Sequence, residues 1–220
     1  MSYKKYINSA LQRRFTLSGI EVFVKDPLPP SIDAKKVLKH VLHLVPRHLM
    51  NNVDIIYIGQ FQKFLDRNIN ASYKMGAIYV TNEQDDFKDM VDDIVHEIAH
   101  AVEESFGELI YSDGKIREEF NSKREKLFFL LADEGYDVEI SDFLQDEYNS
   151  RFDNYLLQDI GYPVLSVLAS SLFITPYAIT SLREYFAVGF EKYFFEKDIN
   201  NLRKISPFLL EKIQILEYNN

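Results

Sequence analysis

Apolar side chains recur at helical spacing over residues about 85–106, which is the longest amphipathic pattern in the chain. Such spacing predicts a helix with one apolar face directed into a core. Gly107 follows the pattern, and we expect the helix to end there because glycine readily adopts the left-handed conformation of a helix C-cap. The apolar stripe of this helix is formed by Ile94, Val95, Ile98, Ala99 and Val102.

Strand-like patterns lie in the first half of the chain, and helical periodicity dominates the second half. We expect strands at residues 20–24, 53–58, near 71–74 and at 77–81. We expect further helices at residues 2–15, about 32–45, 115–132, 181–196 and about 206–217, with two or three more over 141–172. Ser31 follows the proline-rich run 27–30 and is the expected N-cap of the 32–45 helix. These elements predict an α+β fold, predominantly helical, with a small twisted sheet packed on the 85–106 helix.

Length and composition limit the architecture and the class of partner. The chain has 220 residues, of which 46% are hydrophobic, and this suffices for one well-buried core. We expect a single domain over residues 1–220, with one lobe over about 1–106 and a helical lobe over about 107–220. The net charge of −9 argues against nucleic acid and anionic membranes as the main partners.

The sequence indicates the cellular compartment of the protein only weakly. The chain contains no cysteine, begins without an apolar signal segment, and has no apolar run of about 18 residues that could span a membrane. We therefore expect no membrane association. The protein is expected in the cytoplasm, or exported without a recognisable signal peptide, and as a monomer.

Within the 85–106 helix, residues 96–100 read His-Glu-Ile-Ala-His, an H-E-x-x-H motif. Histidines four apart lie on one helix face, where both imidazoles can reach one metal ion. Glu97 stands beside the first histidine and is a candidate general base for an attacking water. Because the chain has five histidines, a chance match is improbable, although a helix with solvated histidines is the alternative.

A catalytic zinc ion requires a third protein ligand. The acids just after the motif, Glu103 and Glu104, share the helix with His96 and His100 and cannot easily meet the same ion. His40 and His43 lie upstream, where an exposed polar face is the favoured interpretation. The remaining acidic candidates are Asp133, Glu134, Glu184 and Glu191.

Glu184 is our choice, because it lies in the strongly apolar helical run 181–194. A carboxylate in such a helix is costly to bury unless it is paired or binds a metal. Asp133 and Glu134 come at the end of a predicted helix, where exposed acids are ordinary. Glu191 shares the face of Glu184 and is the more exposed alternative.

These two segments, residues 96–100 and 177–187, resemble the catalytic domain of anthrax lethal factor and the related Pro-Pro endopeptidases. The resemblance extends loosely over about 32–112 and 174–218. It implies a zincin-like fold and a gluzincin pattern, in which His96, His100 and Glu184 bind one zinc ion and Glu97 is the general base. It also implies that Tyr177, seven residues before Glu184, points at the metal and stabilises an oxyanion.

Two departures from the family accompany this resemblance. Val188 occupies the position one turn after the ligand glutamate, where lethal factor has an acid that could orient a zinc-binding histidine. Asp92, Asp93 or a backbone carbonyl are the candidates for that role here. The second departure is an insertion over about 113–173, whose role is open.

The expected function is therefore that of a zinc metalloendopeptidase acting on a protein or peptide substrate. The strand residues Gly76, Ala77, Ile78 and Tyr79 are expected to pair with the substrate backbone by strand addition. Two alternatives are a non-catalytic zinc-binding relative, such as a toxin-like binding module, and a metal-dependent amidase acting on cell-wall peptides. The intact Glu97 argues against the first alternative, since a binding module needs no general base.

Overall fold

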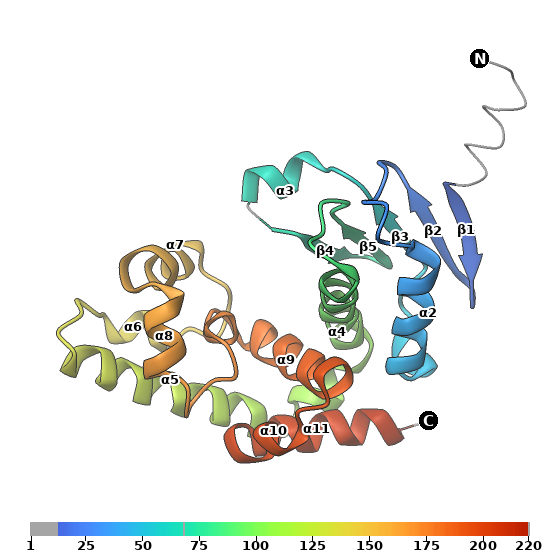
Figure 1. The fold of residues 1–220 in the computed structure, drawn as a ribbon. Coiled ribbons are helices and arrows are strands. Elements are labelled where there is room, and N and C mark those ends of the chain that lie inside the picture. The colour runs from blue at the N-terminus through green and yellow to red at the C-terminus, as the bar shows by residue number, and fades with distance from the viewer. Residues whose placement is uncertain (1–12, 68, 220) are drawn as a thin grey trace, which may run out of the picture. The chain divides into compact units, whose positions relative to one another are not determined.

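A computed structural model describes residues 13–67 and 69–219. The chain separates into two compact units, residues 1–105 and 106–220, and the boundary falls inside one long helix (Figure 1). A helix was expected at residues 2–15, and residues 2–12 of it lie outside the described part of the chain. Its last two positions, Arg14 and Phe15, belong to a strand, so the helix prediction is wrong there.

The first unit contains a five-stranded mixed sheet with the strand order β1-β2-β3-β5-β4. The central strands β2, β3 and β5 are parallel, and the outer strands β1 and β4 pair antiparallel to their neighbours. The predicted strands at 20–24, 53–58, 71–74 and 77–81 are all present within a few residues. The strand bounds are β1 Arg14–Leu17, β2 Ile20–Val24, β3 Ile55–Ile58, β4 Ala71–Lys74 and β5 Ala77–Val80.

The two faces of this sheet differ in character because successive strand residues point to opposite sides. Val22, Ile56 and Ile78 are in register across the central strands and are at most 1% exposed. On the opposite face Tyr57 stacks on Tyr79 with ring centroids 5.1 Å apart. The sheet therefore contributes one aliphatic face to the core of the first unit.

Helices α2 (Ala34–Leu44) and α4 (Phe87–Tyr111) lie on one side of the sheet in Figure 1. The His40 ring of α2 contacts the Phe87 ring of α4, with centroids 5.6 Å apart. Asp33 is the N-cap of α2, since its side chain accepts the backbone N–H groups of Lys35 and Lys36, so the assignment of Ser31 as cap is wrong. The unit also contains the short helices η1 (Arg47–Met50) and α3 (Gln62–Arg67).

Helix α4 has the apolar stripe that the sequence predicts. Ile94, Val95, Ile98, Ala99 and Val102 are each at most 1% exposed. The helix does not end at Gly107, however, and continues to Tyr111. Ile110 is completely buried, and its packing offsets the cost of about 1 kcal/mol that glycine imposes inside a helix.

Helices are the only regular secondary structure in the described residues of the second unit. The predicted helices near 115–132, 181–196 and 206–217 are present, and the region 141–172 holds short helices that break at Gly161 as expected. Helices α6 and α10 were not predicted separately. The bounds are α5 Lys115–Asp133, α6 Ile140–Phe143, α7 Ser150–Asn154, η2 Tyr155–Ile160, α8 Tyr162–Leu168, η3 Pro176–Ile179, α9 Leu182–Glu191, η4 Lys192–Glu196, α10 Ile199–Ile205 and α11 Pro207–Tyr218.

Helix α9 packs closely on α11. A Cβ atom built on Gly189 would lie 2.3 Å from Cδ2 of Leu209, so glycine permits an approach that a larger residue would prevent. The Tyr111 ring at the end of α4 contacts Phe186 of α9, with centroids 6.4 Å apart. Lys212 of α11 donates to the carbonyl oxygen of Leu109 over 2.9 Å, which satisfies an unpaired carbonyl group at the end of α4.

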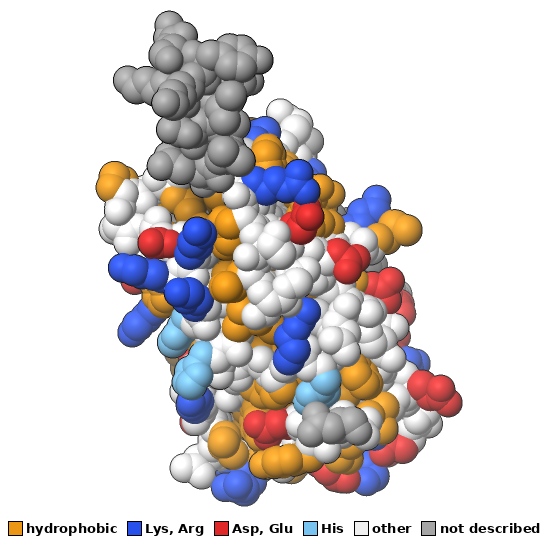
Figure 2. All heavy atoms as spheres, turned by 90° about the vertical axis from the view of Figure 1, so that its right-hand side faces the viewer, with side chains coloured by type: hydrophobic (Ala, Val, Ile, Leu, Met, Phe, Trp, Pro, Cys, Tyr) orange, Lys and Arg blue, Asp and Glu red, His pale blue; other side chains and the backbone are white. Residues whose placement is uncertain are grey.

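The class predicted from the sequence, α+β and mostly helical with a small sheet, is confirmed, and the sheet is mixed. None of the helices in the described part of the chain is long and apolar enough to cross a membrane. Acidic and basic side chains both occur on the face drawn in Figure 2, interspersed with hydrophobic ones.

Candidate metal centre

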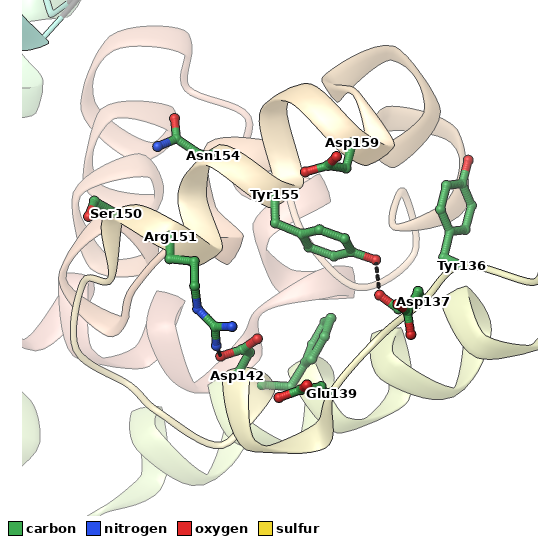
Figure 3. Close-up of a pocket in the computed structure, with 10 residues that line it drawn as sticks. Tyr136, Asp137, Glu139, Asp142, Ser150, Arg151, Asn154, Tyr155 and Asp159 are labelled. Carbon is green, nitrogen blue, oxygen red and sulfur yellow. Dashed lines mark hydrogen bonds and ion pairs between the residues drawn. The ribbon is translucent and has the colours of Figure 1, made fainter.

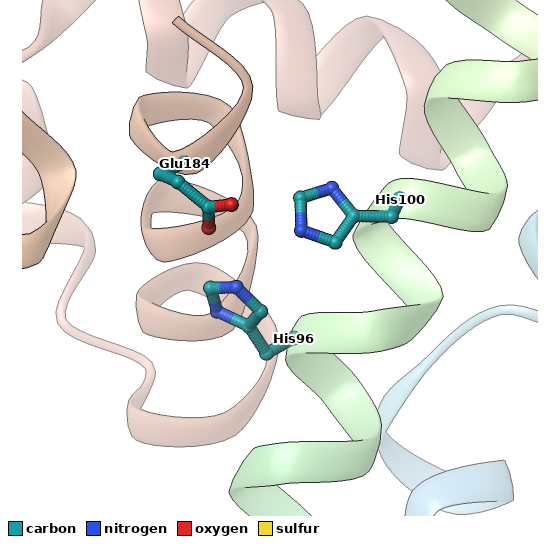
Figure 4. Close-up of side chains that lie close together, drawn as sticks. All are labelled: His96, His100 and Glu184. Carbon is teal, nitrogen blue, oxygen red and sulfur yellow. The ribbon is translucent and has the colours of Figure 1, made fainter. Parts of the chain in front are cut away.

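His96 and His100 project from the same side of α4 (Figure 4). Their ring centroids are 5.2 Å apart, and the ring planes are nearly perpendicular, at 81°. His100 is 9% exposed, and Val95, Ile98 and Ala99 around the pair are buried. The expectation that the two imidazoles lie on one helix face is therefore confirmed.

Glu103 orients the second histidine. Its Oε2 atom lies 2.9 Å from Nδ1 of His100, and both residues are buried. In the tautomer with the proton on Nδ1, His100 donates to this carboxylate, and the Nε2 lone pair is left to bind a cation. A carboxylate partner of this kind fixes the orientation of a metal-binding histidine and raises its basicity.

This role of Glu103 was missed in the sequence. Glu103 was weighed only as a metal ligand, while Asp92, Asp93 or a backbone carbonyl were the candidates for orienting a histidine. The signal that could have found it is the i, i+3 spacing from His100, which makes the two side chains neighbours on a helix surface.

Asp93 lies one helical turn before Glu97, and its carboxylate accepts a hydrogen bond from a residue that precedes α4. Gln84 Nε2 donates to Oδ2 of Asp93 over 2.8 Å. Burial raises the pKa of Asp93 to about 6, and the neighbouring acids Asp89 and Glu97 add to this rise. Glu97 itself is only 6% exposed. The helix thus presents a buried carboxylate directly beside His96, in an environment unlike that of a solvated surface acid.

Glu184 lies in the first turn of α9. Ser181 is the N-cap, and its Oγ atom accepts the backbone N–H of Glu184 at 3.2 Å. The sequence Ser-x-x-Glu at 181–184 is that of a capping box, which by itself accounts for a glutamate at this position. Leu182 and the residues from Tyr185 onward are buried, whereas Glu184 is partly exposed.

The competing acids are in ordinary surroundings. Asp133 and Glu134 are exposed at the end of α5, as predicted. Glu191 is buried rather than exposed, and its Oε1 atom lies 3.5 Å from Nζ of Lys192. Glu191 is thus a buried carboxylate with a cationic side chain beside it.

Tyr177 is in the 3-10 helix η3 and is partly exposed. Its carbonyl oxygen accepts hydrogen bonds from the backbone N–H of Thr180 at 3.1 Å and from Oγ1 of Thr180 at 2.8 Å. This turn ends directly before the N-cap of α9, so Tyr177 and Glu184 belong to consecutive elements of the second unit.

Among residues 13–67 and 69–219, His96 and His100 of α4 and Glu184 of α9 each offer one ligand atom that could bind a metal ion (Figure 4). They offer two imidazole nitrogens and one carboxylate oxygen, which is a donor set that catalytic zinc takes. The donor chemistry therefore fits the metal that the sequence predicts.

The substrate-binding expectation for residues 76–79 is contradicted by the sheet. Strand β5 is hydrogen-bonded to β3 on one side and to β4 on the other, so its backbone cannot accept another strand. Gly76, Ala77, Ile78 and Tyr79 thus lose the proposed pairing role. Strand β4 is the edge on this side of the sheet, and an edge strand has backbone groups free to pair.

A cavity of about 870 Å³ lies in the second unit, within the predicted insertion (Figure 3). Its lining is polar and acidic. Arg151 pairs with Asp142, and the hydroxyl of Tyr155 donates to the carbonyl oxygen of Asp137 over 2.8 Å. The cavity contains none of the predicted site residues.

The chain was compared with protein-family models, with curated proteins and with solved structures, and nothing matches in any of the three comparisons.

Proposed function

We propose that this protein is a zinc-dependent endopeptidase with a zincin-like fold, in which His96, His100 and Glu184 bind one zinc ion. The observation that carries the proposal is the arrangement on α4, where two adjacent imidazoles share a face and a buried carboxylate holds Nδ1 of His100. A pair of merely solvated histidines needs no such anchor.

The chain's own residues account for the remaining chemistry. When bound, zinc supplies Lewis-acid polarisation of the substrate carbonyl and increases the acidity of a water molecule. Glu97 accepts the proton of the attacking water, since it is buried next to His96. Tyr177 donates its O–H to the oxyanion that develops on the substrate, an interaction made mainly in the transition state.

The substrate backbone is proposed to pair with the edge of β4, residues 71–74, instead of β5. A peptide in extended conformation can add to such an edge through main-chain hydrogen bonds. The strand is four residues long, which matches recognition of a short peptide segment.

The proposal is tested by measuring zinc content and cleavage with the same purified samples. We expect about one zinc ion per chain in the wild type, and loss of bound zinc in His96→Ala and Glu184→Ala. Glu191→Ala is the matched control, because it removes a glutamate from the same helix and should leave the zinc content unchanged.

Cleavage is assayed with a library of peptides derived from whole proteomes. Equal zinc content in the wild type and Glu184→Ala would contradict the proposed ligand set. Zinc binding without any cleavage would favour a non-catalytic binding module, and cleavage of cell-wall peptides alone would favour an amidase.

A further inference from the structure

A buried hydrogen-bonded network surrounds Tyr185, the residue that follows Glu184 on α9. The ammonium group of Lys123 on α5 donates to the Tyr185 hydroxyl at 2.5 Å and to Oγ of Ser206 at 2.8 Å. The Tyr185 hydroxyl in turn donates to Oε1 of Glu119 at 2.7 Å. Every atom of this chain of contacts lies in the second unit.

The network is largely buried. The side chains of Lys123 and Glu119 are 9% and 6% exposed, and Tyr185 is 1% exposed. Glu119 also accepts the backbone N–H groups of Phe208 and Leu209 at 3.0 and 3.2 Å, at the start of α11. Lys123 and Glu119 therefore connect α9 to α5 and α11 through polar contacts with fixed directions.

Stability alone does not require this arrangement. Apolar residues of similar volume often replace a buried ionic network with equal or greater stability. What a fully satisfied network adds is a single, rigid geometry. The Tyr185 ring also contacts the rings of Phe120 and Phe173, with centroid distances of 5.3 and 5.9 Å.

We infer that Lys123 and Glu119 are positioning residues, which hold Tyr185 and thereby set the rotation of α9 that aims the neighbouring Glu184 carboxylate at the metal. This inference rests on the proposed function. Glu184 and Tyr185 are consecutive residues of one helix, so fixing the helix rotation at Tyr185 also fixes the direction in which the Cα–Cβ bond of Glu184 leaves the helix.

The required precision explains why a rigid network is useful. A side-chain tip lies about 5–6 Å from a helix axis, so a rotation of α9 by about 20° displaces the carboxylate by roughly 2 Å. Metal–ligand distances tolerate deviations of only about 0.2 Å. The cap at Ser181 fixes the backbone of Glu184, and the Tyr185 network fixes the helix rotation at the next residue.

The test compares zinc affinity in Tyr185→Phe and in a matched control, Tyr193→Phe. The Tyr193 hydroxyl also bonds a glutamate, at 2.5 Å from Oε2 of Glu217, but lies in η4, beyond the end of α9. Zinc affinity is measured by competition with a chelator, at a temperature where all variants are folded by circular dichroism. We expect about tenfold weaker zinc binding in Tyr185→Phe and a change below about twofold in Tyr193→Phe.

Cobalt substitution gives a second readout that does not depend on activity. A displaced carboxylate changes the visible absorption of bound Co²⁺, so we expect an altered spectrum in Tyr185→Phe and an unchanged one in Tyr193→Phe. Lys123→Met removes the ammonium group but keeps the apolar stem, and we expect it to weaken zinc binding as well. This variant takes the place of Tyr185→Phe in the test if Tyr185→Phe does not fold.

Wild-type zinc affinity and an unchanged cobalt spectrum in both Tyr185→Phe and Lys123→Met would overturn the positioning role while leaving the proposed function intact. Absence of zinc binding in the wild type would instead refute the proposed function, and this inference with it.

Discussion

Nδ1 of His100 lies 2.9 Å from Oε2 of Glu103, and both side chains are buried on α4. The contact joins residues three apart, so it forms within a single helix and needs no other element to position it. Its consequence is that Nδ1 of His100 is engaged by an internal carboxylate, which makes Nε2 the nitrogen that could bind a cation.

Replacing Glu103 should therefore weaken metal binding without removing a ligand. We expect Glu103→Ala to lower zinc affinity about 10- to 100-fold, because the His100 ring loses the partner that fixes its tautomer and orientation. Chelator competition measures the effect. Glu104→Ala, at the exposed neighbouring position, is the control and should bind zinc as the wild type does. Similar affinities for both variants would show that Glu103 does not orient the histidine.

Glu97→Gln should separate metal binding from catalysis. The amide keeps the shape of the buried carboxylate but cannot accept a proton from water, so we expect retained zinc and a loss of about 10²- to 10⁴-fold in kcat. Zinc content and peptide cleavage on the same sample measure the two effects. Full activity in this variant would exclude Glu97 as the general base.

Two glycines inside helices should respond to alanine in opposite directions. Gly189→Ala forces a Cβ atom toward Leu209 Cδ2, at 2.3 Å, and overpacking of this kind costs about 1–3 kcal/mol of unfolding free energy. Gly107→Ala meets no atom within 4 Å and should stabilise the protein by up to about 1 kcal/mol through helix propensity. Urea denaturation measures both. Equal effects of the two substitutions would contradict the close contact between α9 and α11.

Lys123 should make stability rise with pH in a defined window. Burial lowers the pKa of Lys123 from 10.5 to about 8, with the charge of Glu119 acting in the opposite direction. Between these two pKa values the unfolded chain binds a proton that the folded chain has released, so the free energy of unfolding increases with pH. Below about pH 8 Lys123 is protonated in both states, and its contribution to the free energy of unfolding does not change with pH.

The measurement is a comparison of Lys123→Met with the wild type. In urea denaturation at pH 7.5 and pH 9.5, the wild type should gain on the order of 1–2 kcal/mol relative to the variant at the higher pH, because one pH unit corresponds to about 1.4 kcal/mol. Titrations common to both proteins cancel in this difference. A difference that does not change with pH would mean that Lys123 keeps its ordinary pKa in the folded protein.

The spacing of residue types along the chain was sufficient to predict the features that depend only on residues close in sequence. The face shared by His96 and His100 follows from four-residue spacing, and the buried stripe of α4 follows from helical periodicity. Helix ends were less predictable. Gly107 was expected to end α4, but the helix continues to Tyr111, where the burial of Ile110 stabilises the last turn. Glu184 and Tyr177 stay predictions, because their roles rest on the proposed zinc site.

Contacts between distant segments decided the rest. Strand β5 is interior and β4 is an edge. Ser72 and Lys74 make β4 the more polar of the two, but its edge status is decided by which other strands pair with each. The partners of Tyr185 come from positions more than 20 residues away on α5 and near α11. A sequence encodes periodicity along its own backbone directly, whereas the pairing of remote polar groups is fixed only when the folded core excludes water from them.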